Sequence, residues 1–136
     1  KVLADLGYMV GTVERNIPAN KSRSFSIRKD LFGLIDSLAI SIDNSHLVGV
    51  QSTTRRQMAT HLREYRSNPA TILALHRWLG EKHRLFEIWG WEKVGNRWCS
   101  TRWHIEMVGA VPTAFDTDGN LIHKPKVPRG TPEAAA

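Results

Sequence analysis

The segment that most constrains this chain is residues 28–57, in which an otherwise apolar run carries one carboxylate, Asp36. A turn at residues 43–45 follows, and the next apolar run ends in two polar side chains, Gln51 and Thr53. The composition of the two runs predicts adjacent strands joined as a hairpin. Polar groups on adjacent strands can converge on one point, and that arrangement suits a divalent metal and a phosphodiester.

Asp36 needs a partner, because moving a carboxylate from water into apolar surroundings is costly unless it is hydrogen-bonded, paired or bound to a metal. The sequence leaves two explanations. Asp36 either binds a metal ion, or it caps a neighbouring loop or pairs with Arg28 or Lys29. Asp30 is expected to cap the start of a helix, with a supporting place beside the site as the alternative.

Periodicity predicts the remaining strands and helices. Strand patterns cover residues 8–15, 34–42, 84–94 and 97–108, and residues 1–6 have the pattern of a helix end. The apolar run at 34–42 is expected to be buried on both faces. Thr54 and Gln57 match a capping box at the start of a helix, and Pro69 is expected to begin another helix. Met58, Leu62 and Tyr65 give the first of these helices an apolar stripe.

The order of these elements predicts the α/β class. It runs from a helix through a meander of three strands and one or two helices to a further pair of strands, which suits a mixed central sheet flanked by helices. We expect a single domain over residues 1–111. The composition changes after Pro112 to Asp, Gly, Pro, Lys and Ala, and this favours a tail or arm with little core over residues 112–136.

Charge favours a polyanionic partner. The chain has 19 Lys and Arg against 13 Asp and Glu, for a net charge of +6. Residues 15–29 hold five basic residues and no acidic one, and residues 54–84 hold seven against two. Basic patches attract nucleic acid. Because the clusters flank Asp36 and Gln51, nucleic-acid binding stands about equal with the alternative, a role in solubility alone.

The chain has no apolar run near the roughly 20 residues of a membrane span, and residues 1–6 lack the apolar region of a signal peptide. Cys99 is the single cysteine. It is expected to be packed in a strand, and it fits the reducing cytoplasm of a bacterial or phage-infected host cell.

The order of elements around Asp36 and the Gln51/Thr53 pair resembles the core of the PD-(D/E)XK nucleases. Restriction endonucleases and archaeal Holliday-junction resolvases belong to this superfamily, and the segment Asp30-Leu31-Phe32-Gly33 resembles that of small phage and environmental members. The resemblance spans roughly residues 1–95. It implies a restriction-endonuclease-like αβββαβ core and a metal-dependent endonuclease that acts on DNA phosphodiester bonds, including those of branched DNA.

The resemblance also implies site residues. Asp36 matches the strand Asp that binds Mg²⁺ or Mn²⁺ in the superfamily, whereas Gln51 and Thr53 stand where it has Glu or Asp and then Lys. Gln51 offers a neutral carbonyl oxygen to a hard ion, and Thr53 cannot replace the Lys as an electrostatic partner. Asp36, Gln51 and Thr53 are therefore the candidate catalytic residues. Asp36 and Gln51 are the candidate metal ligands, with Glu14 as a further one.

The residues expected to hold the DNA backbone are basic: Arg23, Arg28, Lys29, Arg55 and Arg56. Lys29, Arg55 and Arg56 are also candidate replacements for the missing Lys. Because the Glu and Lys of the motif are absent, a catalytically inactive nucleic-acid-binding module with the same fold is the alternative function. The resemblance further implies a homodimer. Trp89 and Trp91 share one face of a strand by period two. We expect them to form a core or dimer contact, and the alternative, if they are exposed, is stacking on bases.

Overall fold

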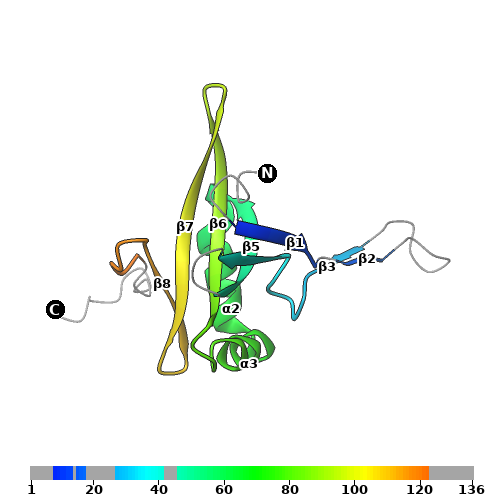
Figure 1. Cartoon of the computed structure of the whole chain (residues 1–136). Coiled ribbons are helices and arrows are strands. Elements are labelled where there is room, and N and C mark those ends of the chain that lie inside the picture. The colour runs from blue at the N-terminus through cyan, green and yellow to red at the C-terminus, as the bar shows by residue number, and fades with distance from the viewer. Residues whose placement is uncertain (1–7, 14, 18–26, 42–45, 123–136) are drawn as a thin grey trace, which may run out of the picture.

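The computed structural model describes residues 8–13, 15–17, 27–41 and 46–122, which form a six-stranded sheet, a two-stranded sheet and helices (Figure 1). The large sheet contains β1 (Tyr8–Thr12), β4 (Ser37–Ser41), β5 (Leu47–Thr54), β6 (Arg84–Val94), β7 (Arg97–Val108) and β8 (Val111–Phe115). The small sheet contains β2 (Arg15–Ile17) and β3 (Ile27–Lys29). The helical segments are η1 (Arg55–Gln57), a 3₁₀ turn, then α2 (Met58–Ser67) and α3 (Pro69–Trp78).

The strands of the large sheet lie in sequence order, β1-β4-β5-β6-β7-β8. Each neighbouring pair is antiparallel except β5 and β6, which are parallel. A parallel pair needs a crossover connection, and the segment from η1 to α3 provides it. The predicted α/β class with a mixed central sheet is therefore confirmed.

The described helices cover one face of the sheet. Met58, Leu62 and Tyr65 are buried, as the apolar stripe predicts. They pack with Leu75 of α3 against side chains of the sheet that include Phe86, Ile88 and Ile105. The η1 turn lies so close to β6 that a Cβ on Gly90 would be 2.9 Å from Arg55 Cα. Gly90 is therefore required by this helix–sheet contact.

A second apolar cluster occupies the opposite face of the sheet. Ala39, Val48, Val50 and Trp89 are buried there, and Leu85 and Trp91 pack against them. The rings of Trp89 and Trp91 are 5.8 Å apart, so the prediction that these residues share one face is confirmed.

Two hairpins extend away from the centre of the molecule (Figure 1). β2 and β3 pair antiparallel beside the large sheet. β6 and β7 pair from Phe86 and Ile105 to Val94 and Arg97. β6 continues beyond Trp91, its last residue that pairs with β5. The predicted bounds of these two long strands, 84–94 and 97–108, are confirmed.

The helix ends differ partly from the prediction. Asn68 caps α3, since its side chain accepts a hydrogen bond from the Ala70 N–H and Pro69 follows at the first helical position. Thr54, however, makes no side-chain capping bond, and a 3₁₀ turn precedes α2. The predicted capping box is wrong because Thr54 is still the last extended residue of β5 and pairs with Trp91.

The strand expected over 34–42 begins later, at Ser37. Leu34 and Ile35 are fully buried but belong to a turn, in which Phe32 has φ 57° and Gly33 φ 72°. Burial on both faces is also wrong, because Ile40 is exposed. The apolar run at 34–42 therefore contains buried residues, but only the part from Ser37 onward is a strand.

The boundary expected at residue 112 falls inside β8. Pro112, Thr113 and Ala114 are buried, and β8 pairs with β7. The tail prediction is therefore wrong for residues 112–115, while residues 123–136 and the helix end expected at 1–6 lie outside the described residues. Cys99 is exposed rather than packed, because it lies near the end of the β6–β7 hairpin.

Candidate functional site

Asp36 lies directly before β4 and is held there by its backbone. Its N–H donates to the Val50 carbonyl at 2.9 Å, and its carbonyl accepts from the Val13 N–H at 3.0 Å. These bonds join the segment leading into β4 to β5 on one side and to the end of β1 on the other. The carboxylate is thereby fixed beside the last third of β5.

Asp36 and Gln51 meet, as the sequence predicts. Gln51 Nε2 donates to Asp36 Oδ2 at 3.2 Å, and the Ser52 N–H donates to the same oxygen at 2.7 Å. Both side chains are buried, with exposed fractions of 8% for Asp36 and 6% for Gln51. Hydrogen bonds to an ionised carboxylate stabilise its charged form, so the backbone of β5 helps to hold a negative charge in the protein interior.

Tyr65 of α2 completes this group. Its hydroxyl donates to Gln51 Oε1 at 3.3 Å. Burial, and then the charges of Asp30, Asp36 and Glu64, raise the pKa of the Tyr65 hydroxyl above its usual value of 10.0. The hydroxyl therefore stays protonated and keeps donating, which orients the Gln51 amide with its nitrogen toward Asp36. We call Asp36, Gln51 and Tyr65 the carboxylate–amide site.

Thr53 lies two residues after Gln51, on the same face of β5, and contacts α2. Its Oγ1 is 3.2 Å from His61 Nε2. The other ring nitrogen, His61 Nδ1, is 3.9 Å from Glu64 Oε2. Thr53 therefore contacts the imidazole of His61.

The carboxylate–amide site fits a weakly held hard cation. Among the described residues, no group of three or more His, Cys, Asp or Glu side chains could hold a metal ion. The site can offer one carboxylate, Asp36, and one amide oxygen if the Gln51 amide turns by 180°. Its nitrogen would then donate to the Tyr65 oxygen. Mg²⁺ commonly uses one or two protein oxygens together with water and phosphate.

The expected DNA-contacting residues fall into different environments. Arg55 Nη1 pairs with Glu92 Oε1 at 2.8 Å on the surface, whereas Arg56 and Lys29 are exposed. Arg28 lies in β3 opposite Asn16, and its side chain is outside the described part of the structure. Arg23 and Glu14 also lie outside the described residues.

Tyr65 and His61 are the site residues that sequence reasoning missed. They belong to a helix, and their contacts to β5 depend on how α2 packs on the sheet. One signal was present for Tyr65, because a tyrosine in an apolar stripe needs a hydrogen-bond partner for its hydroxyl when it is buried.

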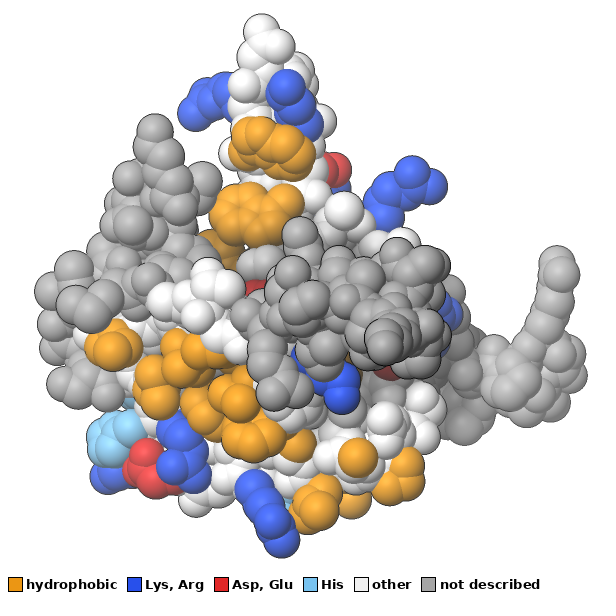
Figure 2. Space-filling view, turned by 90° about the vertical axis from the view of Figure 1, so that its right-hand side faces the viewer, with side chains coloured by type: hydrophobic (Ala, Val, Ile, Leu, Met, Phe, Trp, Pro, Cys, Tyr) orange, Lys and Arg blue, Asp and Glu red, His pale blue; other side chains and the backbone are white. Residues whose placement is uncertain are grey.

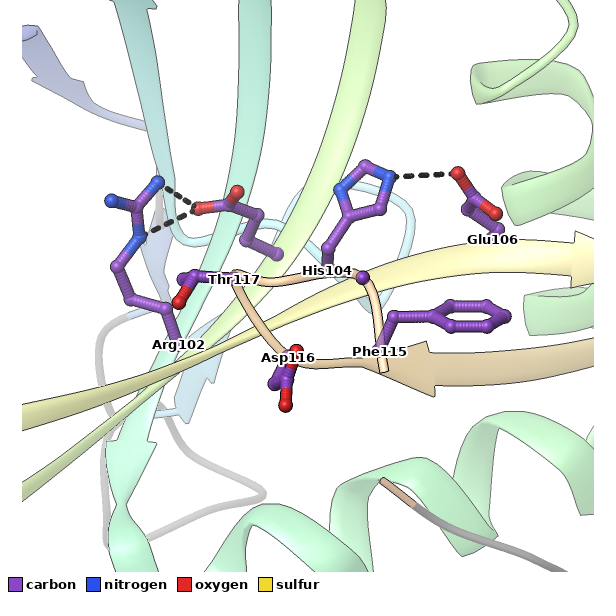
Figure 3. A pocket seen from close by; sticks show the side chains of 8 residues that line it. Arg102, His104, Glu106, Phe115, Asp116 and Thr117 are labelled. Atoms are coloured by element: carbon purple, nitrogen blue, oxygen red, sulfur yellow. Dashed lines mark hydrogen bonds and ion pairs between the residues drawn. The ribbon is translucent and has the colours of Figure 1, made fainter. Parts of the chain in front are cut away.

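A second polar cluster lies on the opposite face of the sheet, around a cavity of about 510 Å³ (Figure 3). Arg102 Nη2 and Nε both donate to Glu87 Oε1, at 2.8 and 3.1 Å, and Trp89 Nε1 donates to that oxygen at 3.0 Å. His104 contacts Glu106 at 3.1 Å. Glu87 is as buried as Asp36, at 8%, but here an arginine neutralises the carboxylate, which indicates a structural role at the root of the hairpin.

No family model, curated protein or solved structure matches this chain. None of the helices in the described part of the chain has the length and apolar character that crossing a membrane requires. The interpretation of the site therefore depends on its own geometry.

Proposed function

We propose that this chain is a metal-dependent endonuclease-like protein that acts on DNA phosphodiester bonds. One observation carries the proposal: Asp36 and Gln51, 15 residues apart, face each other at 3.2 Å where the segment before β4 meets the end of β5. A sequence that only built an apolar sheet has no reason to place a carboxylate and an amide together there, because burying polar groups is unfavourable without compensation.

The fold adds support. The described strands β1, β4 and β5 form a meander, and the helical crossover leads to the parallel strand β6. This order is compatible with the βββαβ part of the restriction-endonuclease-like core that the resemblance implies. Asp36 directly precedes β4, and Gln51 and Thr53 lie in β5, which supports the proposal that these residues form one site.

Each residue has a role in the proposal. Asp36 and Gln51 would hold Mg²⁺ or Mn²⁺, and the ion would polarise the scissile phosphate and make water a better nucleophile. Tyr65 orients the Gln51 amide. His61, in contact with Thr53, is the candidate proton acceptor in place of the family Lys. Arg56 and Lys29 are exposed cations for the DNA backbone, and a homodimer remains part of the proposal by resemblance.

One observation favours the alternative, a catalytically inactive nucleic-acid-binding module. Gln51 directs its amide nitrogen to Asp36 and its oxygen to Tyr65. Asp36 Oδ2, the Gln51 amide and the Tyr65 hydroxyl are thus hydrogen-bonded in a chain without an ion. Binding a metal has to rearrange this network, which lowers affinity.

The test is nicking of supercoiled and branched DNA by the whole chain with Mg²⁺ or Mn²⁺. Asp36→Asn is the informative variant, because an amide can keep hydrogen bonds to Ser52 and Gln51 while it removes the charge. We expect its cleavage rate to fall at least about 100-fold, as for loss of groups that hold or orient metals. Glu87→Gln is the matched control: an equally buried carboxylate changes, and cleavage should persist.

The outcomes separate the hypotheses. If the wild-type chain cuts nothing but still shifts DNA in a gel, the nuclease proposal fails and the binding module stands. If it neither cuts nor binds at low salt, both fail. Equal cutting by wild type and Asp36→Asn, with circular dichroism showing both folded, would mean that another site performs the chemistry.

A further inference from the structure

The β6–β7 hairpin extends past the end of its neighbour β5. The last β5–β6 pair is Thr54 with Trp91, and the strands of the hairpin remain paired with each other to Val94 and Arg97. A positive φ at Gly95 closes the turn. The end of the hairpin is therefore a two-stranded ribbon that stands out from the sheet (Figure 1).

One face of this ribbon combines indole rings and cations. Trp89, Trp91 and Lys93 alternate along β6 and so share a face. The register places Arg102 opposite Trp89 and Trp98 opposite Lys93, which puts them on the same face. The Arg102 guanidinium lies 4.3 Å from the centre of the Trp89 ring, so this face already contains a cation stacked on an indole.

The outer part of this face is open to solvent. Trp98 has an exposed fraction of 63%, Lys93 is exposed, and Trp91 is half-buried. Hydrophobic and basic side chains gather on the projecting hairpin (Figure 2). An exposed indole at the end of a projecting element contributes little to the core, and exposed apolar groups rimmed by polar residues mark interaction sites.

The charge of this region is complementary to a polyanion. Residues 93–102 contain three basic residues, Lys93, Arg97 and Arg102, and no acidic one. Of the nearby carboxylates, Glu92 pairs with Arg55 and Glu87 with Arg102. The end of the hairpin therefore presents aromatic faces together with positive charge.

We propose that Trp91, Lys93 and Trp98, the hairpin platform, bind unpaired bases of DNA. The indole faces of Trp91 and Trp98 stack on bases, and Lys93 contacts the phosphates, the combination that binds single strands. Bases inside a duplex are stacked on each other and offer no free face. The platform therefore selects DNA with a single-stranded segment, such as a splayed end or a branch.

This inference rests on the proposed function for DNA as the substrate and adds the kind of DNA. The platform faces away from α2, whereas Gln51 and Thr53 face it. A DNA molecule in contact with both therefore passes around the end of β5, with its unpaired segment on the hairpin. Binding to the platform and cleavage at the site can thus be measured separately.

The test measures fluorescence anisotropy of labelled oligonucleotides with the whole chain in EDTA, where metal-dependent cleavage is absent. A fully paired duplex is compared with a splayed duplex carrying single-stranded arms. Trp98→Ala should weaken binding of the splayed DNA about 5- to 150-fold, the usual range for loss of one base–aromatic stack, and leave duplex binding unchanged. Trp98→Phe should keep most of the affinity, because a ring remains.

One control variant and one further platform variant complete the test. Leu73→Ala removes another exposed apolar side chain, 50% exposed on α3, and should change neither affinity. Lys93→Ala should weaken binding of both DNAs and reduce the salt slope by about 1, as for loss of one phosphate contact.

The inference is overturned if Trp98→Ala binds splayed DNA as wild type does, or if Leu73→Ala loses as much affinity. It is also overturned if sedimentation without DNA shows that Trp98→Ala converts a dimer into a monomer, because the platform would then be a contact between two copies. If the wild-type chain cleaves DNA and Trp98→Ala binds splayed DNA as tightly as wild type, the platform is rejected and the nuclease proposal stands. If the wild-type chain does not cleave DNA but Trp98→Ala selectively loses binding of splayed DNA, the nuclease proposal is rejected and the platform stands.

Discussion

The carboxylate–amide site and the hairpin platform use their side chains in opposite ways. In the first region, Asp36 and Gln51 are buried and joined to each other by a hydrogen bond. In the second, Trp98 is 63% exposed and projects on a ribbon beyond the sheet. A substitution in the site changes stability and chemistry together, whereas a substitution on the platform changes recognition alone. Function can therefore be changed without a change in stability on the platform, but not in the carboxylate–amide site.

The largest effect is expected at Gly90, which lies between the two regions. A Cβ there would meet Met58 side-chain atoms and lie 2.9 Å from Arg55 Cα. Because backbone cannot move as easily as a flexible side chain, Gly90→Ala should lower the free energy of unfolding by about 3 kcal/mol, the upper part of the range for overpacking. Urea denaturation measures this, and a loss below about 0.5 kcal/mol would show that α2 can shift at no cost.

Gln51→Glu tests the site by restoring the carboxylate of the PD-(D/E)XK motif. Two carboxylates within 3.2 Å repel, so without metal this variant should lose about 2 kcal/mol of stability, within the range for breaking a buried polar contact. Mn²⁺ should restore the loss and raise the melting temperature more than in wild type, because added ligand charge increases affinity. Thermal melts with and without Mn²⁺ measure both effects, and Gln51→Met is the uncharged control.

Tyr65→Phe should cost about 1 kcal/mol at neutral pH by removing the bond to Gln51. The raised pKa adds a pH dependence. Above pH 10 the folded chain keeps the phenol proton of Tyr65, whereas the unfolded chain releases it. The contribution of protonated Tyr65 to the free energy of unfolding is therefore fully present below pH 10 and declines as the pH rises. Wild type should therefore lose stability more steeply than Tyr65→Phe above pH 10, with a difference in slope that approaches about 1.4 kcal/mol per pH unit near pH 11. Urea titrations from pH 9 to 11 measure the free energy of unfolding of both proteins. Equal slopes of this free energy against pH for wild type and Tyr65→Phe would contradict the prediction.

The smallest effect is expected on the platform. Trp98→Ala should change the free energy of unfolding by less than about 0.5 kcal/mol, as exposed substitutions usually do. Chemical denaturation of wild type and variant gives the difference. A loss above about 2 kcal/mol would place Trp98 in a structural contact and remove the contrast between the two regions.

The sequence predicts most of the sheet, because alternation is a local signal. The strands from Arg84 and Arg97 follow the period of two, and the structure has their predicted bounds. β8 escaped prediction because Pro112 favours a loop by composition, although proline is compatible with an edge strand. There its carbonyl accepts a bond from Arg66 Nε at 2.7 Å, a contact between α2 and β8 that no local pattern contains.

The candidate site was predictable in part for the same reason. Asp36 directly precedes β4 and Gln51 lies in β5, so their meeting followed from the predicted hairpin. Tyr65 and His61 reach β5 from α2 across the helix–sheet interface, and their contacts depend on the rotation of the helix. The turn at Phe32 and Gly33 was hidden by the apolar residues around it, since burial and strand conformation are separate properties.

The most direct measurement is titration with Mn²⁺ followed by electron paramagnetic resonance, which reports free ion. The central claim is that Asp36 and Gln51 form one site for a divalent ion. It predicts that wild type and Glu87→Gln each bind one Mn²⁺ per chain, and that Asp36→Asn binds it at least about 10-fold more weakly. Equal binding by wild type and Asp36→Asn, or no binding by wild type at millimolar Mn²⁺, would contradict the claim.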